Sequence, residues 1–144
     1  MVDQIFIKAL RIRTIQDKGV QRVGDDIASE FKGIINYGVI GLIQLALNKP
    51  AVEDVAVAQV NAWYEQYIGQ AKATMLDKNH DYGEAWREMR ISSITDLIYQ
   101  KVLRTKQIED NQGKTLVSEG LDANYYDMLN YAVFCLIKMM EEKI

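Results

Sequence analysis

The chain has very little of several residue types on which common enzyme and metal-site chemistries depend. It holds one histidine, one cysteine and one proline in 144 residues. His80, which we expect in a loop, has no second histidine or nearby cysteine, so the sequence gives no support to a zinc site or a catalytic triad. Cys135 lies in an apolar stretch, which predicts a buried, reduced thiol. A glycine-rich phosphate loop, a dinucleotide fingerprint and a nucleophile elbow are also missing.

Excess positive charge and long apolar runs are absent as well. The 17 Lys and Arg residues stand against 20 Asp and Glu residues, a formal charge of −3. This balance disfavours nucleic-acid binding, although the Lys and Arg residues between 87 and 106 keep it as a minor alternative. The longest apolar stretch, residues 33–47, is shorter than the roughly 18 residues that a membrane-spanning helix needs. With no export signal at the N-terminus, we expect a soluble, cytoplasmic protein with no membrane contact.

What the chain does contain is an internal repeat. Residues 3–17 match residues 96–110 at an offset of 93, and residues 19–49 match residues 113–143 at an offset of 94. The identical pairs include Lys8 with Lys101, Arg11 with Arg104 and Asn36 with Asn130. Such self-similarity indicates a fold made from copies of one supersecondary unit.

Each copy has the pattern of a helix, a loop and a second helix. Apolar residues at helical spacing predict helices over residues 3–15 and 26–47 in the first copy. In the second copy, Ser93 and Asp96 resemble a capping box that starts one helix, and another is predicted over residues 121–143 after a polar loop.

A third long helix, predicted over residues 53–76, joins the two copies. Residues 79–82 interrupt the helical pattern, and a short helix is expected through Trp86 and Met89. The sequence therefore predicts one all-α domain over residues 1–144, a helical bundle made of two divergent helix-loop-helix repeats joined by a long helix.

The first repeat unit, residues 1–50, is partial and degenerate, whereas the second, residues 71–144, is complete. Nothing before Asp3 matches the opening segment of the second unit. Loss of that segment, an internal start at Met1, or its supply by a partner chain would each explain the difference. Because the core of the first unit would otherwise be uncovered, we expect a homodimer.

The second unit gathers polar residues at spacings that suit a ligand site. Asp127 and Asn130 share one face of their predicted helix, and Lys101 and Arg104 share one face of theirs. A carboxylate and an amide facing two cations would suit a metal-bound phosphate. The same residues could instead form an ordinary ion pair between helices, with Lys101 joined to Asp127 or to Asp96.

The first unit has lost part of this set. Gly33 and Ala28 align with Asp127 and Asp122, and Glu30 aligns with Asn124, while both cations are kept. We interpret the second unit as the one with a working site and the first unit as a scaffold copy. Near the second site, Tyr82 and Trp86 could stack on a base, or could be core residues, as aromatic side chains at helical spacing commonly are.

Three segments carry a resemblance to a known family. The stretches KNHDYGEAW (residues 78–86), SSITDLIYQKVLR (residues 92–104) and EGLDANYYDMLNYAVF (residues 119–134) resemble the nucleotide modification associated domain 1 family, and the first half is similar to a second, partial copy of it. More distantly, NYYDMLNYAVF is similar to the second metal motif of MazG-like all-α nucleoside triphosphate pyrophosphohydrolases. There, acidic residues hold magnesium against the triphosphate. Asn124 departs from that motif, because a Glu would be expected, and Lys101 and Arg104 replace a paired-glutamate motif.

The resemblance and the residues together imply a nucleotide-binding protein, which could be a magnesium-dependent pyrophosphohydrolase acting on modified nucleotides. Asp127 and Glu119 would act in catalysis, and Mg²⁺ would be held by Asp127, Asp122 and Glu119. The residues expected to bind the nucleotide are Lys101, Arg104, Asp81, Tyr82, Trp86, Arg90 and Asn130. The alternative is a non-catalytic helical interaction module, in which the polar cluster is a buried network that fixes helix register.

Overall fold

The protein is all-α over the residues that the computed structural model describes, which are 1–19, 26–47, 56–111 and 120–142. No strand occurs in these ranges. The elements are, in chain order, α1 (Val2–Lys18), α2 (Ile27–Leu47), α3 (Val57–Tyr82), the 3₁₀ helix η1 (Ala85–Glu88), α4 (Ile91–Asp110) and α5 (Leu121–Glu142). The predicted all-helical bundle is confirmed.

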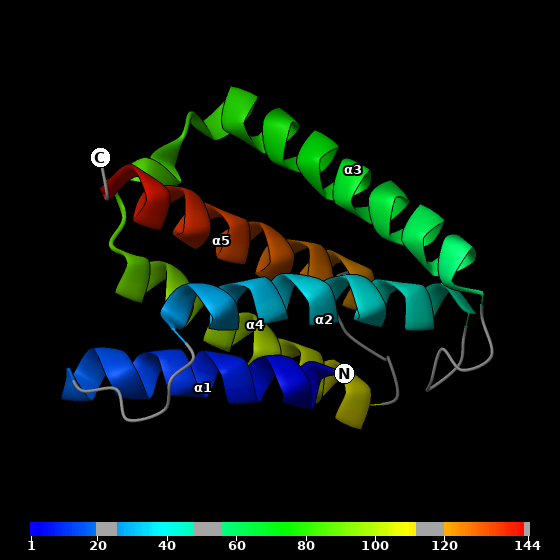
Figure 1. The fold of residues 1–144 in the computed structure, drawn as a ribbon, viewed down its shortest axis with the longest axis horizontal. Helices are drawn as coiled ribbons and strands as arrows, with labels where there is room; N and C mark the ends of the chain where they lie inside the picture. The colour runs from blue at the N-terminus through cyan, green and yellow to red at the C-terminus, as the bar shows by residue number, and fades with distance from the viewer. Residues whose placement is uncertain (20–25, 48–55, 112–119, 143–144) are drawn as a thin grey trace.

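Four of the helices form a two-layered bundle. Helices α1 and α4 pack side by side in one layer, and α2 and α5 form the other (Figure 1). Sequence neighbours α1 and α2 run antiparallel, as do α4 and α5, so each unit is a helical hairpin. Helix α3 lies across the outer side of the layer made by α2 and α5.

The core lies between the two layers and follows the apolar spacing of the sequence. Ile5, Ala9 and Ile12 on α1 are fully buried, as are Ile98 and Val102 on α4. Residues spaced by three or four fall on one helical face, which explains why these positions meet in the interior. Helix α3 is an outer helix, because Ala71 is its single buried residue.

Two ion pairs join α1 to α4, and the repeat alignment matches the residues of one pair with those of the other. Arg13 lies 3.3 Å from Asp96, and Lys106 lies 3.0 Å from Asp3. The alignment matches Asp3 with Asp96 and Arg13 with Lys106. A two-fold relation between the hairpins would produce this pairing, although the repeat itself stays a prediction from the sequence.

The aromatic contacts between α1 and α4 also involve residues that the repeat alignment matches. Phe6 and Tyr99, which the alignment matches, face each other with ring centroids 5.7 Å apart. Arg13 lies 5.1 Å from the centroid of Tyr99, and Lys106 lies 4.4 Å from that of Phe6. A cation over the face of an aromatic ring at such a distance is attracted electrostatically to the ring.

Helices α2 and α5 approach closely because α2 carries glycines where they cross. A Cβ atom on Gly38 would lie 3.5 Å from Cβ of Leu129, which is ordinary contact. A Cβ atom on Gly41 would lie 2.6 Å from the ring of Tyr125, which is too near for any real carbon. Gly41 is therefore the position that admits the Tyr125 ring into the core.

Two predicted boundaries were wrong. Helix α3 continues through residues 79–82, which were expected to interrupt it, and ends at Gly83, whose φ of 63° suits glycine. His80 consequently lies in the last turn of a helix and not in a loop. Polar, exposed residues at the end of an outer helix have the composition of a loop, and this caused the error.

The start of α4 also differs from the prediction. The helix begins at Ile91 with Arg90 as its N-cap residue, which makes no side-chain capping hydrogen bond. Ser93 and Asp96 lie within the helix, so they do not form the expected capping box. Residues 53–55, 112–119 and 143, included in the predicted helices and loop, lie outside the described residues. No described helix is long and apolar enough to cross a membrane.

Cys135 is a buried thiol, as predicted, and burial raises its pKa to about 12. Because the folded pKa lies above the usual value of 9.0, the thiol stays protonated in the folded protein between pH 9 and about 12. We expect iodoacetamide at pH 8 to label Cys135 slowly in the folded protein and rapidly in urea, as measured by intact mass. Equal labelling rates would contradict the burial of this side chain.

Replacing Gly41 with alanine tests the contact between α2 and α5. The new Cβ would collide with the Tyr125 ring, so Gly41→Ala should lower the free energy of unfolding by about 1–3 kcal/mol in urea titrations. Gly69→Ala is the matched control, because Gly69 is an exposed helical glycine with open space around it. That variant should gain up to about 1 kcal/mol from helix propensity alone. Equal effects at both positions would refute the close approach.

Candidate functional site

Asp127 on α5 joins cations from two other helices. One carboxylate oxygen lies 3.1 Å from Nζ of Lys78 on α3, and the other lies 3.1 Å from Nζ of Lys101 on α4. The Asp127 side chain is only 18% exposed, so solvent screens these contacts less than it would at the surface. Asp127 and Lys101 thus face each other across the α4–α5 pair, as the sequence predicted.

A cavity of about 240 Å³ adjoins this carboxylate, between the end of α3, η1 and α5. Its walls are largely apolar, and its polar lining residues include the ion pair of Lys78 with Asp127. The lining residues are Met75, Lys78, Asn79, Tyr82, Gly83, Ala85, Trp86, Met89, Leu97, Asp127, Asn130, Tyr131 and Phe134. Apolar concavities with a few convergent polar groups are the usual form of small-molecule sites.

Trp86 forms part of the core and of the cavity wall at once. It is 8% exposed and stacks on Phe134 with ring centroids 4.5 Å apart. Its indole Nε1 is buried and has no hydrogen-bond partner among the described residues. Tyr82, by contrast, is 79% exposed at the cavity mouth. The core alternative therefore holds for Trp86 and does not hold for Tyr82.

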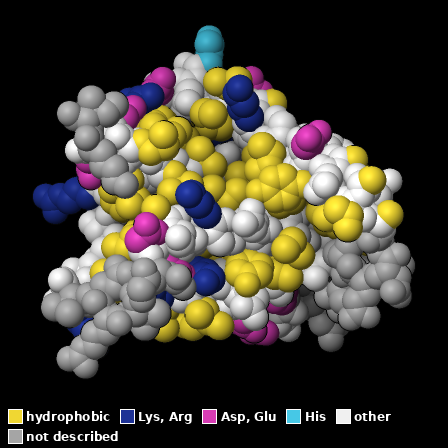
Figure 2. Space-filling model, viewed as in Figure 1, with side chains coloured by type: hydrophobic (Ala, Val, Ile, Leu, Met, Phe, Trp, Pro, Cys, Tyr) yellow, Lys and Arg dark blue, Asp and Glu magenta, His cyan; other side chains and the backbone are white. Residues whose placement is uncertain are grey.

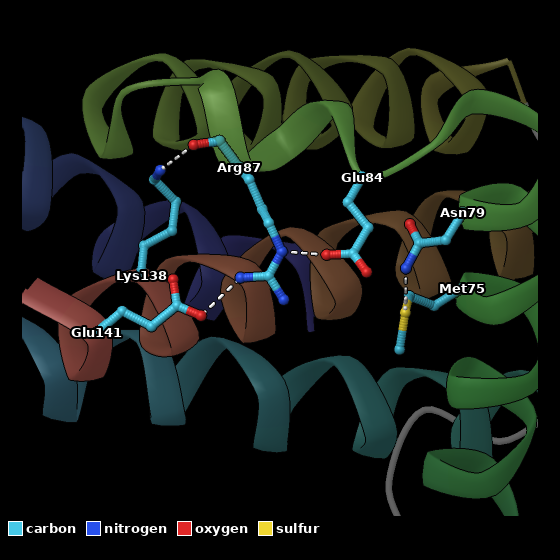
Figure 3. Close-up of polar contacts among 6 residues, drawn as sticks. All are labelled: Met75, Asn79, Glu84, Arg87, Lys138 and Glu141. Atoms are coloured by element: carbon cyan, nitrogen blue, oxygen red, sulfur yellow. Dashed lines mark hydrogen bonds and ion pairs between the residues drawn. The ribbon is translucent and has the colours of Figure 1, made fainter.

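Polar contacts fix η1 against the end of α5 (Figure 3). The Arg87 guanidinium hydrogen-bonds to Glu84 and, at 2.6 Å, to Glu141. Lys138 donates a hydrogen bond of 2.8 Å to the carbonyl of Arg87. The hydrogen bonds to Glu84 and then to Glu141 raise the pKa of Arg87. Arg87 also covers the Trp86 ring, 4.4 Å from its centroid.

Two aligned asparagines dock the bundle onto α3. Asn130 donates a hydrogen bond of 3.2 Å to the carbonyl of Ala71. Asn36, its counterpart in the first unit, accepts one of 2.6 Å from the hydroxyl of Tyr64. Asn130 also lines the cavity, so this side chain both forms part of the cavity wall and holds α5 against α3.

Other predicted site residues lie apart from the cavity. Asp81 is exposed on the last turn of α3, 3.1 Å from His80, and Arg90 is exposed at the N-cap of α4. Arg104 is half-buried one turn beyond Lys101 on α4. Neither arginine lines the cavity beside Asp127.

The three predicted magnesium ligands are not gathered in the part of the chain that the structure describes. Asp122 lines a different cavity, of about 560 Å³, bounded by Leu42, Tyr67 and Tyr126 among others. Glu119 lies outside the described residues. Within the described ranges, no three His, Cys, Asp or Glu side chains lie close enough to hold a metal ion. The described residues thus do not fit a carboxylate-rich magnesium site, which takes several oxygen ligands.

The first unit balances its charges differently. Glu30 is 3% exposed and lies 3.3 Å from Lys8 and 2.8 Å from Arg11. The stem of Lys8 covers Gly33, the counterpart of Asp127, with its Cε 3.3 Å from where a Cβ would stand. Sequence analysis noted the substitution at Glu30 but did not predict this ion-pair cluster.

Two further residues were missed in the second unit. Lys78 lies on the helix that joins the units and has no counterpart in the alignment, so the comparison of copies could not reveal it. Asn124 was treated as a departure from a motif, yet it is 1% exposed and neither its Nδ2 nor its Oδ1 has a partner among the described residues. A polar residue inside an apolar helical stripe was the available signal.

Removing the Arg87 contacts tests whether they hold η1 over Trp86. In a Trp63→Phe background, Arg87→Ala should increase acrylamide quenching of Trp86 fluorescence, since it frees η1 from α5. Arg13→Ala is the control, because Arg13 also pairs with a carboxylate and covers an aromatic ring, but in the α1–α4 layer. Quenching that rises equally in both variants, or in neither, would show that Arg87 does not anchor η1.

Comparison with known proteins assigns the amino-acid sequence to a family. No curated protein and no solved structure matches the chain. The model of the nucleotide modification associated domain 1 family matches residues 1–45 and 78–139, which include α1, nearly all of α2, η1, α4 and most of α5. The two matched segments end at Leu45 and Met139, positions that the repeat alignment pairs. The chain therefore belongs to the nucleotide modification associated domain 1 family.

Proposed function

We propose that the protein binds a nucleotide in the cavity between α3, η1 and α5. One observation carries this proposal: an apolar cavity with an aromatic wall is lined by Lys78 and by Asp127, whose carboxylate also holds Lys101. A nucleotide has the complementary character, with a flat, largely apolar base and an anionic phosphate chain. The description of the family, which refers to nucleotide modification, agrees with this ligand class.

The cavity residues suggest how the ligand would lie. Met75, Met89 and the edge of Trp86 offer apolar surface for a base, with Tyr82 free to cover it from the mouth. Lys78 and Lys101 would receive phosphate oxygens. Asp127 holds the two ammonium groups near each other and lowers the repulsion between them while no phosphate is bound.

Magnesium-dependent pyrophosphohydrolysis is a second proposal, for which Asp127 is the supporting residue. The described residues bring a single carboxylate to the cavity, so a metal there would depend on the ligand phosphates for its remaining oxygens. In that case Mg²⁺ should strengthen triphosphate binding, and Asp127→Ala should abolish the enhancement. Binding that is unchanged by Mg²⁺ would reject the metal and leave the nucleotide site intact.

An interaction module is the competing proposal, and the saturation of Asp127 by two lysines favours it. Under this reading the ion pairs only fix how α3, α4 and α5 pack. Asp127→Ala would then lower the melting temperature, and no nucleotide would shift it. Homodimer formation and a cytoplasmic location are further proposals from the sequence; light scattering that gives a monomer mass would reject the dimer.

A nucleotide panel with charge variants tests the proposal. Common and base-modified nucleoside triphosphates should raise the melting temperature of the wild type. Lys101→Ala should weaken their binding about tenfold, because a charge-assisted hydrogen bond is lost. Lys106→Ala is the control, since Lys106 lies on the same helix but pairs with Asp3. Pyrophosphate release is measured in the same samples. If no nucleotide changes the melting temperature and no pyrophosphate is released, the interaction module is favoured. If Lys101→Ala and Lys106→Ala weaken nucleotide binding equally, the ligand binds elsewhere.

A further inference from the structure

The outer side of the α1–α4 layer carries exposed apolar side chains that no described helix covers. Helix α3 lies across the other layer, which is made by α2 and α5 (Figure 1). On α1, Ile7 is 55% exposed and Leu10 is 45% exposed, and on α4 Leu103 is 44% exposed. Single exposed apolar residues are ordinary, but several on one face with charges around them are typical of an interaction surface.

The half-buried rings of Phe6 and Tyr99 join these side chains into one patch. Their centroids lie 5.7 Å apart between α1 and α4. The two ion pairs between these helices fix their antiparallel register, which places Leu10 opposite Tyr99 and Leu103 opposite Phe6. Together with Ile7, these four residues form a continuous apolar surface across both helices, here called the outer patch.

Four charged side chains form the corners of a rectangle around the outer patch, and their signs alternate. Arg13 lies 3.3 Å from Asp96 at one end, and Lys106 lies 3.0 Å from Asp3 at the other. Along α1, Asp3 and Arg13 are separated by about 15 Å, the rise of ten helical residues. Asp96 and Lys106 have the same spacing on α4. Every edge of the rectangle therefore joins an acidic corner to a basic one.

An alternating rectangle of charges is complementary to a second copy of itself. A half-turn about an axis that lies in the face, either along the helices or across them, exchanges corners that share an edge. Each acidic corner of one chain then lies over a basic corner of the other, and the two outer patches meet between them. Two-fold dimers require a self-complementary surface of this kind. The ion pairs within each chain are kept, so the arrangement does not need any of these charges to lack a partner.

We propose that this face is a dimer interface, through which two copies of the chain associate about a two-fold axis. The outer patches form its centre and the charged corners form its rim, as is common in specific interfaces. The proposal does not rest on the nucleotide site, because that cavity lies between the end of α3, η1 and α5. It also differs from the dimer expected from the sequence, in which the partner covers the first unit where its opening segment is missing.

Sedimentation equilibrium of the full chain, without nucleotide and over a range of protein concentrations, tests the interface. The wild type should form a dimer. The double variant Leu10→Lys, Leu103→Lys should weaken dimerisation by at least about a hundredfold, because ammonium groups replace apolar side chains at the centre of the interface. Leu76→Lys is the matched control, because Leu76 is 54% exposed on α3, on the other side of the bundle. That variant should remain dimeric, and circular dichroism should show the same helix content in all three proteins.

Reversing one corner tests the charged rim. Lys106→Glu places a carboxylate at a basic corner, so like charges face each other about either axis. Dimerisation should therefore weaken about tenfold. Lys72→Glu makes the same change at an exposed position of α3 and should leave the dimer unchanged.

The outcomes separate this face from other ways of associating. Weakening that is confined to the variants of the α1–α4 layer, with helix content unchanged, supports the interface. A wild type that stays monomeric at every concentration would overturn the proposal and leave the face to a different protein. A dimer that survives the double lysine variant would place the interface elsewhere. Equal weakening by Lys106→Glu and Lys72→Glu would reduce the charge effect to net charge and overturn the complementary rim.

Discussion

The cations on the buried side of α1 and α4 have to be neutralised, and this requirement organises the charged part of both hairpins. For Lys8, Arg11 and Lys101, the neighbouring helices α2 and α5 supply the compensating carboxylates. Partly buried charges interact strongly because the protein interior screens them poorly. The carboxylates of Glu30 and Asp127 stand at positions one helical turn apart in the repeat alignment, and each contacts a different set of cations.

The two carboxylates have different surroundings in the two hairpins. In the first hairpin, Glu30 satisfies both cations and the Lys8 stem fills the space over Gly33. In the second, Asp127 reaches Lys101 and also Lys78 from α3, and a cavity lies beside it. Residues at the end of α3 and in η1 supply much of the cavity wall. Elsewhere, α3 packs on α2 and α5 through hydrophobic side chains, and hydrophobic side chains are prominent on this face of the molecule (Figure 2). The joining helix thus contributes residues to a cavity beside the second hairpin.

Much of the fold could be predicted from the sequence because helical periodicity is a strong local signal. The buried positions Ile5, Ile98 and Val102 follow directly from apolar spacing. The end of α3 could not be located, because exposed helical residues such as Lys78 and His80 have the same polarity as loop residues. Helix boundaries depend on caps and packing that single-sequence patterns do not specify.

The candidate site was predicted less completely, for a different physical reason. Lys101 and Asp127 could be paired because helical spacing shows which residues share a face. Lys78 enters from a separate helix, and no spacing rule brings α3 to α5. The paired cluster at Glu30 and the unpartnered amide of Asn124 depend on burial between packed helices, which emerges only from the assembled bundle.

The most direct test of the account is to observe the side chain of Asn130, which lines the cavity beside Asp127, while a nucleotide is added. Its Nδ2 hydrogens can be assigned in amide NMR spectra by their absence from the Asn130→Asp variant. The account predicts that nucleoside triphosphates shift these signals and leave those of Asn61, exposed on α3 outside the cavity lining, unchanged. Shifts confined to other regions, with the Asn130 signals unmoved under saturating ligand, would contradict the claim that the nucleotide binds in this cavity.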